Sequence, residues 1–247
     1  GGTATGTDAI AIGERSNASG ILSIALGVDL GARGIITVAL GQEAKALGDD
    51  SAAVGTRAKA VANYSTALGN QSTAEKEFDL AAGYNTIASG GQSTAVGYAA
   101  RSKGFASNAI GGSSLAEGDY SIALGQESKT GAGYTLAAGY KAKASGEQST
   151  AVGFNSESTG YASNAIGSSS LAKGVHSTAI GSSSLAEGDY SIALGQEATT
   201  GANKNFATAL GYKANASGWS SFAQGAYAEA SGGGSIAIGD SSKATTN

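Results

Sequence analysis

The chain has 247 residues, a formal net charge of −4 and 40 glycines, and it contains no proline, cysteine or methionine. This composition excludes a disulfide framework and a collagen-like chain, and one histidine without cysteine argues against a structural zinc site. No apolar run reaches the ~20 residues of a membrane span, and 15 scattered lysines and arginines argue against a nucleic-acid surface. A disordered small-residue segment or a repeat protein remains.

The triplet Ala-x-Gly recurs every 14 residues along the whole chain. Its alanine runs at this spacing from Ala11 to Ala193, and after a slip of two residues it stands at Ala209, Ala223 and Ala237. A disordered segment does not need such regular spacing, so the seventeen copies predict a repeat protein. Positions are numbered below from the glycine that closes each triplet, which places the alanine at −2.

Each 14-residue coil has its expected elements in a fixed order. Positions −4, −2, +3 and +5 hold small residues, and this alternation is the period of two that strands produce. Each coil is therefore expected to hold two short strands and two turns. Glycines at 0 and +7, such as Gly27 and Gly34, are expected to supply positive-φ corners. Stacked coils then pair in parallel, which predicts an all-β parallel β-roll of about seventeen coils whose interior accepts only small side chains.

Large aliphatic side chains occupy positions −1 and −3, which point out of the roll by the same parity. Ile24 with Leu26 and Ile122 with Leu124 are typical pairs. Burying each such side chain stabilises by roughly 1.5–3 kcal/mol, much more than an alanine-lined interior contributes. A long exposed apolar stripe marks an interface. We therefore expect an obligate homo-oligomer with its hydrophobic core between chains, while the wall at +2, +4 and +6 faces solvent.

The consensus Ser-x-Ala-[Ile/Leu/Val]-Gly-x-x-Ser carries a family resemblance. Segments 121–128 and 163–170 resemble the head repeats of the Yersinia adhesin A family, the trimeric autotransporter adhesins of Gram-negative bacteria. The resemblance covers residues 1–247 as a single head domain, and it implies a left-handed roll assembled as a homotrimer. It also implies an extracellular head that binds collagen, fibronectin or laminin, abiotic surfaces or sister cells. We expect no neck, stalk or membrane anchor within the chain, so a missing C-terminal region would attach the head to the outer membrane.

Aromatic side chains gather in two columns of the repeat. One column, at position −5, holds Tyr64, Phe78, Tyr120, Tyr134, His176, Tyr190 and Phe206. The other, at position +1, holds Tyr84, Tyr98, Tyr140, Phe154 and Tyr212. Such rings can stack on a ligand or on a neighbouring subunit, and both interpretations stay open. The candidate ligand surface comprises Tyr64, Tyr120, Tyr134, His176 and Tyr190.

The register slips by two residues within residues 196–210, in the segment 199–205. An insertion is accommodated most easily at a turn on the solvent side. Loops of this kind often carry function, which adds Asn203 and Lys204 to the candidate ligand surface. A merely tolerated insertion is the alternative interpretation.

Three polar residues interrupt the apolar stripe, namely Gln224 at −1 and Asn108 and Asn164 at −3. If the stripe faces a threefold axis, three symmetry-related amides of Gln224 meet there. Each amide then needs a partner, because an unsatisfied buried polar group costs about 1–3 kcal/mol. We expect mutual or water-mediated hydrogen bonds, or a bound ion, around Gln224.

Patterns that carry catalysis are missing from the sequence. A serine nucleophile needs an adjacent base, but the one histidine lies in a column of aromatic residues. The glycine-rich residues 231–235 lack the Lys-Ser/Thr of a phosphate loop, so we expect no enzyme, no cofactor and no metal. The predicted function is an adhesin head that multiplies weak contacts by avidity, without inserting into a membrane itself. A purely structural or ice-binding β-solenoid is the alternative, although its regular threonine ranks are missing from the outer wall.

Overall fold

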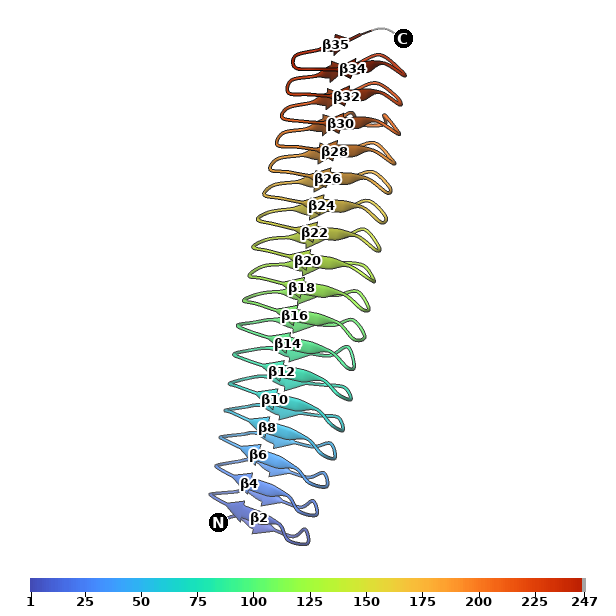
Figure 1. The fold of residues 1–247 in the computed structure, drawn as a ribbon. Coiled ribbons are helices and arrows are strands. Elements are labelled where there is room, and N and C mark those ends of the chain that lie inside the picture. The colour runs from blue at the N-terminus through green and yellow to red at the C-terminus, as the bar shows by residue number, and fades with distance from the viewer. Residues whose placement is uncertain (246–247) are drawn as a thin grey trace. The chain divides into compact units, whose positions relative to one another are not determined.

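The computed structural model describes residues 1–245, and this part of the chain holds 35 short strands and no helix. It divides into two compact units, Gly1–Glu127 and the residues from Ser128 onward, and each unit is a stack of coils (Figure 1). Each full coil contributes one three-residue strand and one two-residue strand. The chain is thus an all-β parallel β-solenoid of about seventeen coils, as the repeat predicts. The single domain predicted for residues 1–247 stays a prediction.

In the first unit the three-residue strands form one parallel sheet and the two-residue strands form another. The three-residue strands cover positions −3 to −1 of the repeat and are β2 (Ile10–Ile12), β4 (Ile24–Leu26), β6 (Val38–Leu40), β8 (Ala52–Val54), β10 (Thr66–Leu68), β12 (Leu80–Ala82), β14 (Thr94–Val96), β16 (Asn108–Ile110) and β18 (Ile122–Leu124). The two-residue strands cover positions +4 and +5 and are β1 (Thr3–Ala4), β3 (Asn17–Ala18), β5 (Gly31–Ala32), β7 (Lys45–Ala46), β9 (Lys59–Ala60), β11 (Thr73–Ala74), β13 (Ile87–Ala88), β15 (Arg101–Ser102) and β17 (Leu115–Ala116).

The second unit repeats this arrangement. Its three-residue strands are β20 (Leu136–Ala138), β22 (Thr150–Val152), β24 (Asn164–Ile166), β26 (Thr178–Ile180), β28 (Ile192–Leu194), β30 (Thr208–Leu210), β32 (Phe222–Gln224) and β34 (Ile236–Ile238). Its two-residue strands are β19 (Lys129–Thr130), β21 (Lys143–Ala144), β23 (Glu157–Ser158), β25 (Leu171–Ala172), β27 (Leu185–Ala186), β29 (Thr199–Thr200), β31 (Asn215–Ala216), β33 (Glu229–Ala230) and β35 (Lys243–Ala244).

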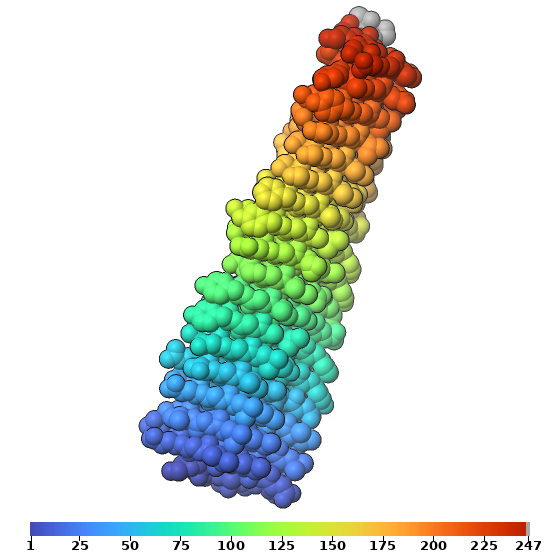
Figure 2. All heavy atoms as spheres, turned by 60° about the vertical axis from the view of Figure 1, so that its left-hand side comes forward, coloured from blue at the N-terminus to red at the C-terminus, as the bar shows by residue number. Residues whose placement is uncertain are grey.

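Within each unit the register pairs every strand residue with the residue at the same repeat position one coil away. Ala67, for example, pairs with Ala53 on one side and with Ala81 on the other. Ile192 pairs with Thr208, so the register is recovered across the two-residue slip. Successive coils therefore form successive layers of side chains within a unit (Figure 2). Any surface property of one repeat position becomes a column that runs along the stack.

The interior of each unit is lined by alanine and serine, as the alternation predicts. The alanines at −2 from Ala25 to Ala223 are fully buried. Buried serines satisfy the backbone at the corners: the Ser107 hydroxyl donates to the Gly104 carbonyl at 2.7 Å, and the Ser114 hydroxyl donates to the Gly111 carbonyl at 2.9 Å. Buried carbonyl groups need hydrogen-bond partners, and serine at −4 and +3 supplies a hydroxyl donor that a purely apolar lining would lack.

The prediction that the interior accepts only small side chains is wrong at two places in the first unit. Leu30 at +3 is only 3% exposed, and Asp79 at −4 is only 1% exposed. Leu30 fits because Gly27 has no side chain: a Cβ on Gly27 would lie 2.7 Å from Leu30 Cδ2. Asp79 fits because both of its carboxylate oxygens are hydrogen-bonded. A bulky or charged group is thus accommodated where its neighbours make room or donate hydrogen bonds.

The predicted role of the second glycine is also wrong. Glycines at position 0 do adopt positive φ, between 120° and 142°, but glycines at +7 such as Gly34 do not. A Cβ on Gly34 would instead overlap the carbonyl group of Gly48 in the next coil, so this glycine is needed for close approach. The left-handed residues of each coil stand at +2 and −5, for example Arg57 and Tyr64, both with φ 58°.

Candidate functional site

The side chains at −3 and −1 of the three-residue strands point outward and form what we term the apolar face. In β18, Ile122 and Leu124 are each 39% exposed, while Ala123 between them is buried. The same alternation holds in the second unit, where Ile192 and Leu194 flank buried Ala193. Because the solvent-exposed aliphatic side chains recur in both units, the outward orientation is confirmed. Burial of this face against other chains stays a prediction.

The three polar residues predicted within the apolar face do lie on it. Gln224 is exposed and pairs in register with Leu210 and Ile238. Asn108 and Asn164 are half-buried at position −3. Their columns are therefore as expected, whereas the threefold axis and the amide contacts across it stay predictions.

Five rings in the second unit form a continuous row along one corner, which we term the aromatic ladder. His176 and Tyr190 stack with centroids 5.2 Å apart, and Tyr190 and Phe206 stack at the same separation. Tyr161 meets His176 edge-on at 5.5 Å, and Trp219 meets Phe206 edge-on at 6.4 Å. All five rings are exposed. The ladder thus offers aromatic edges to solvent over several coils, a surface suited to flat, weak contacts.

Three further predicted ligand residues are not members of this ladder. In the first unit Tyr64 stacks on Phe78 at 4.9 Å, and Tyr120 meets Phe105 edge-on at 5.6 Å. Tyr134, in the second unit, is 61% exposed. The predicted ligand residues thus include members of ring pairs in the first unit and of the ladder in the second unit.

Sequence reasoning missed three ring-bearing residues of these pairs and of the ladder. They stand at position −6, one residue before the predicted column, and are Phe105, Tyr161 and Trp219. The signal was present, because the same 14-residue spacing applies at −6. The left-handed residue at −5 and its neighbour at −6 turn the same corner, so both columns project rings from it.

The two-residue slip forms a bulge directly before the ladder residue Phe206. Asn203 is left-handed with φ 54°, and Ala202, Asn203 and Lys204 are exposed. The backbone N–H of Phe206 still donates to the Asp189 carbonyl at 2.9 Å, so the corner resumes its normal pairing after the bulge. Asn203 and Lys204 are accessible, and their predicted role in ligand binding stays a prediction.

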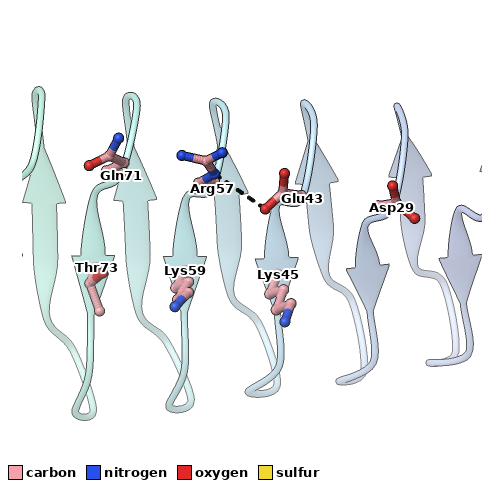
Figure 3. Close-up of a pocket in the computed structure, with 7 residues that line it drawn as sticks. All are labelled: Asp29, Glu43, Lys45, Arg57, Lys59, Gln71 and Thr73. Atoms are coloured by element: carbon pink, nitrogen blue, oxygen red, sulfur yellow. Dashed lines mark hydrogen bonds and ion pairs between the residues drawn. The ribbon is translucent and has the colours of Figure 1, made fainter.

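A groove of mixed charge lies on the wall opposite the apolar face in the first unit. Figure 3 shows Lys45, Lys59 and Thr73 projecting from successive two-residue strands, with acidic, basic and amide side chains at the turns that precede them. Arg57 Nε lies 3.2 Å from Glu43 Oε2 across adjacent coils. Lys45 and Lys59 are register partners, so two like charges lie side by side. This wall faces solvent, as predicted.

Ion pairs on this wall join the same repeat position in successive coils. Three of them have Nζ···Oε1 separations of 2.6–2.7 Å and join Lys103 to Glu117, Lys143 to Glu157 and Lys173 to Glu187. These pairs are exposed, and each contributes on the order of 0–1 kcal/mol. They tie neighbouring coils together weakly and do not mark a reactive site.

A small polar cluster surrounds Lys213 in the second unit. Its ammonium lies 5.2 Å from the Tyr212 ring centroid and 3.5 Å from Glu197 Oε2. The hydrogen bond with Tyr212 and the charge of Glu197 raise the pKa of Lys213. The hydrogen bond with Tyr212 likewise raises the pKa of Tyr227. Both changes favour the protonated forms that already dominate near neutral pH.

Residues 1–245 carry neither a metal-ligand cluster nor a membrane-spanning helix. No group of three or more His, Cys, Asp or Glu side chains in that range could hold a metal ion. No helix among these residues is long and apolar enough to cross a membrane. The surfaces described above can make contacts by aromatic stacking, ion pairing and apolar packing.

The 14-residue coils, small-residue interior and outward apolar face define a repeat protein of the parallel β-solenoid class. The YadA head domain repeat family matches the chain over nearly its whole length, at residues 4–29, 32–58, 46–72, 60–86, 74–100, 102–128, 133–156, 158–184, 172–198, 202–228, 216–242 and 230–247. The chain belongs to this family, which confirms the resemblance carried by the repeat motif. Membership supports an adhesin-like function at a cell surface.

A solved structure is also similar to the chain, the crystal structure of the collagen-binding domain of the Yersinia adhesin YadA. The two share 21% sequence identity with a TM-score of 0.28, and the match covers 62% of each chain. The match thus spans less than two thirds of that domain. No curated protein matches the chain.

Proposed function

We propose that this chain is the head of a homotrimeric, left-handed β-roll adhesin displayed outside a bacterial cell. In this proposal a region beyond the head attaches it to the outer membrane, and the head contacts host matrix proteins, other surfaces and sister cells. The observation that carries the proposal is the apolar face, which recurs in the coils of both units of a chain that belongs to an adhesin-head family. A soluble surface of this kind is covered by association, and a trimer would place its large aliphatic side chains between chains.

Weak binding by repeated coils suits an adhesive function. The outer wall recurs with each coil, rings stand at the corners of several coils, and three chains would multiply every contact again. Linked weak contacts raise the overall affinity by ~10²–10⁴ without any single strong site. Many weak contacts of this kind are therefore compatible with firm attachment.

The proposal is tested by measuring binding and assembly on the same purified chain. Analytical ultracentrifugation should give a trimer, and the trimer should bind immobilised collagen, fibronectin or laminin with a slow apparent dissociation rate. Displayed on bacteria, the head should promote sedimentation of the cells. A monomeric chain, or a trimer that binds none of these surfaces and instead shows thermal hysteresis in freezing solutions, would overturn the proposal in favour of an ice-binding solenoid.

A further inference from the structure

One coil of the first unit interrupts a column of rings. Tyr64 and Phe78 stack at 4.9 Å, and Phe105 and Tyr120 meet at 5.6 Å. In the coil between these two pairs, positions −6 and −5 are occupied by Gly91 and Gln92, so no ring stands there. Phe78 and Phe105 thus stand two coils apart, with no ring between them.

The structure shows a pocket of about 460 Å³ at this place. Phe78 and Phe105 line it, and Gly90 and Gly91 also line it. Phe78 stacks on Tyr64 with an interplanar angle of 4°, so its other face is directed toward the missing ring position. A Cβ placed on Gly91 would make ordinary van der Waals contacts, 3.7 Å from Phe105 Cδ2 and 3.8 Å from Lys76 Cδ, so the ring of Phe105 and the stem of Lys76 flank this glycine.

The backbone beneath the pocket is held by a buried carboxylate. Asp79 replaces the usual serine at −4 and is 1% exposed. Its Oδ1 accepts hydrogen bonds from the Gly91 N–H at 2.9 Å, the Ser93 N–H at 3.0 Å and the Ser93 hydroxyl at 2.8 Å, and its Oδ2 accepts one from the Lys76 N–H at 2.9 Å. This network fixes Gly91 at φ 86°, so the pocket is a built feature of the corner.

The rim of the pocket is charged. Glu75, Lys76 and Glu77 line it with exposed side chains, and none of the ion pairs within the first unit includes them. Gln92 adds an amide. The rim thus carries two carboxylates against one ammonium, beside an aromatic face.

We propose that this pocket binds the guanidinium group of an arginine side chain presented by a partner protein. Guanidinium is planar, stacks on aromatic faces and matches carboxylates with two parallel N–H donors. The free face of Phe78 provides the stack, Glu75 and Glu77 provide the carboxylates, and the Gln92 amide oxygen provides a further acceptor. A lysine ammonium has the charge without the plane, and a neutral ring has the plane without the charge. The role of this pocket in binding a partner protein rests on the proposed adhesive function, but guanidinium binding itself can be tested without an adhesion assay.

The test uses a small probe, N-acetyl-arginine-N-methylamide, with the whole chain. Saturation-transfer NMR should show transfer to the side-chain protons of the probe, with a dissociation constant on the order of 1 mM. The citrulline analogue has the same shape without the charge, and it should bind at least about tenfold more weakly. The same loss is expected for the double variant Glu75→Gln with Glu77→Gln, which keeps the rim's shape.

A filled-pocket variant provides the matched control. Gln92→Tyr places a ring in the column at φ 54°, a backbone conformation that Tyr64 and Tyr120 already adopt, and should abolish probe binding. Gln148→Tyr makes the same substitution at position −5 in the second unit, at φ 60°, and should leave binding unchanged. Circular dichroism verifies that both variants fold.

Four results would overturn the proposal: no saturable transfer, equal binding of citrulline, stronger binding of a phenylalanine analogue, or unchanged binding by Gln92→Tyr. Loss of the assembled state in the Glu75/Glu77 variant without probe binding to the parent would show that a second copy of the chain fills the pocket, which also overturns it. If matrix adhesion fails while the probe binds, the proposed function fails and this inference stands.

Discussion

At the scale of single residues, two kinds of glycine solve different problems in each coil. Glycine at position 0 has φ between 120° and 142°, a conformation that other residues rarely adopt. Glycine at +7 has ordinary backbone angles, but its α-hydrogens face the carbonyl of the next coil. Residues with side chains take the left-handed corners at +2 and −5, where hydrogen bonds to the preceding coil hold them; the Tyr64 N–H, for example, donates to the Asp49 carbonyl at 2.9 Å. Composition alone could not separate these roles.

We expect Gly104→Ala to destabilise the chain strongly. The added methyl would overlap the carbonyl of Gly118, and overpacking against backbone costs about 1–3 kcal/mol or more. Gly112→Ala is the matched control, because a Cβ there lies no closer than 3.8 Å to Gln126 Cγ. Chemical unfolding followed by circular dichroism should separate the two variants. Equal stability would mean that coils can spread apart locally at little cost.

The residue scale also sets the limit of what could be predicted. Parity placed the alanines and serines inside and the aliphatic residues outside, because a period of two allows one arrangement only. Asp79 could not be placed, since its burial depends on donors such as the Gly91 and Ser93 N–H groups that only the folded corner brings together. The rings at −6 recur in the same 14-residue register as those at −5, so the sequence alone was sufficient to predict them.

At the scale of elements, the repeating unit is the coil, and stacked coils align equivalent side chains into columns. Two- and three-residue strands are too short to be stable alone, and they persist because each pairs with an equivalent strand one coil away. The same pairing aligns rings into ladders and opposite charges into ion pairs. A substitution in one coil therefore changes contacts chiefly with the two coils next to it.

Tyr190→Ala should weaken the aromatic ladder measurably. Tyr190 stacks on both His176 and Phe206, and each aromatic pair contributes about 0.5–1.5 kcal/mol, so a loss of about 1–3 kcal/mol is expected. Tyr98→Ala loses one stacked partner, Tyr84, and should cost about half as much. Thermal unfolding measures stability, and the adhesion assay measures function. Lost adhesion with unchanged melting would assign the ladder to ligand contact, whereas lost assembly would assign it to subunit packing.

Deleting Ala202 and Asn203 should restore a regular 14-residue coil. Lys204 would then occupy position +7, where Lys76 already stands in another coil, so we expect the free energy of unfolding to change by less than about 1 kcal/mol. Deleting Glu147 and Gln148 is the contrasting control, since it shortens a regular coil from fourteen to twelve residues and shifts its residues out of register with the neighbouring coils. Binding to matrix proteins, measured alongside stability, shows whether the bulge has a role. Impaired binding by a stable deletion variant would show that the bulge contributes to ligand binding.

At the scale of the whole molecule, the large apolar side chains and the enclosed interior are separated. The interior is filled mainly by alanine and serine, whereas the large aliphatic side chains of the three-residue strands lie outside on one face. In a globular protein the large apolar side chains usually lie inside, whereas in this single chain they lie outside. The proposed trimer would restore the usual arrangement by placing the aliphatic side chains between copies.

Leu124→Glu should break the assembly and leave the coils intact. Loss of the aliphatic side chain from an interface costs about 1.5–3 kcal/mol per chain, and a carboxylate there would add repulsion between copies. Thr73→Glu, on the outward side of β11 in the opposite wall, should leave the oligomeric state unchanged. Sedimentation velocity is the measurement. A Leu124→Glu trimer as stable as the parent would place the interface elsewhere.

The alanine and serine interior also has a thermodynamic consequence. Heat-capacity change on unfolding comes from apolar surface exposed to water, about 0.45 cal/mol/K per Å², and polar surface lowers it. An isolated coil stack should therefore fall below the usual ~12–15 cal/mol/K per residue, with a stability curve that is flat in temperature. In the proposed trimer, the aliphatic contacts between chains would give the stability curve its curvature instead. Since hydrophobic contacts weaken on cooling, cold should separate the chains well before it unwinds the coils.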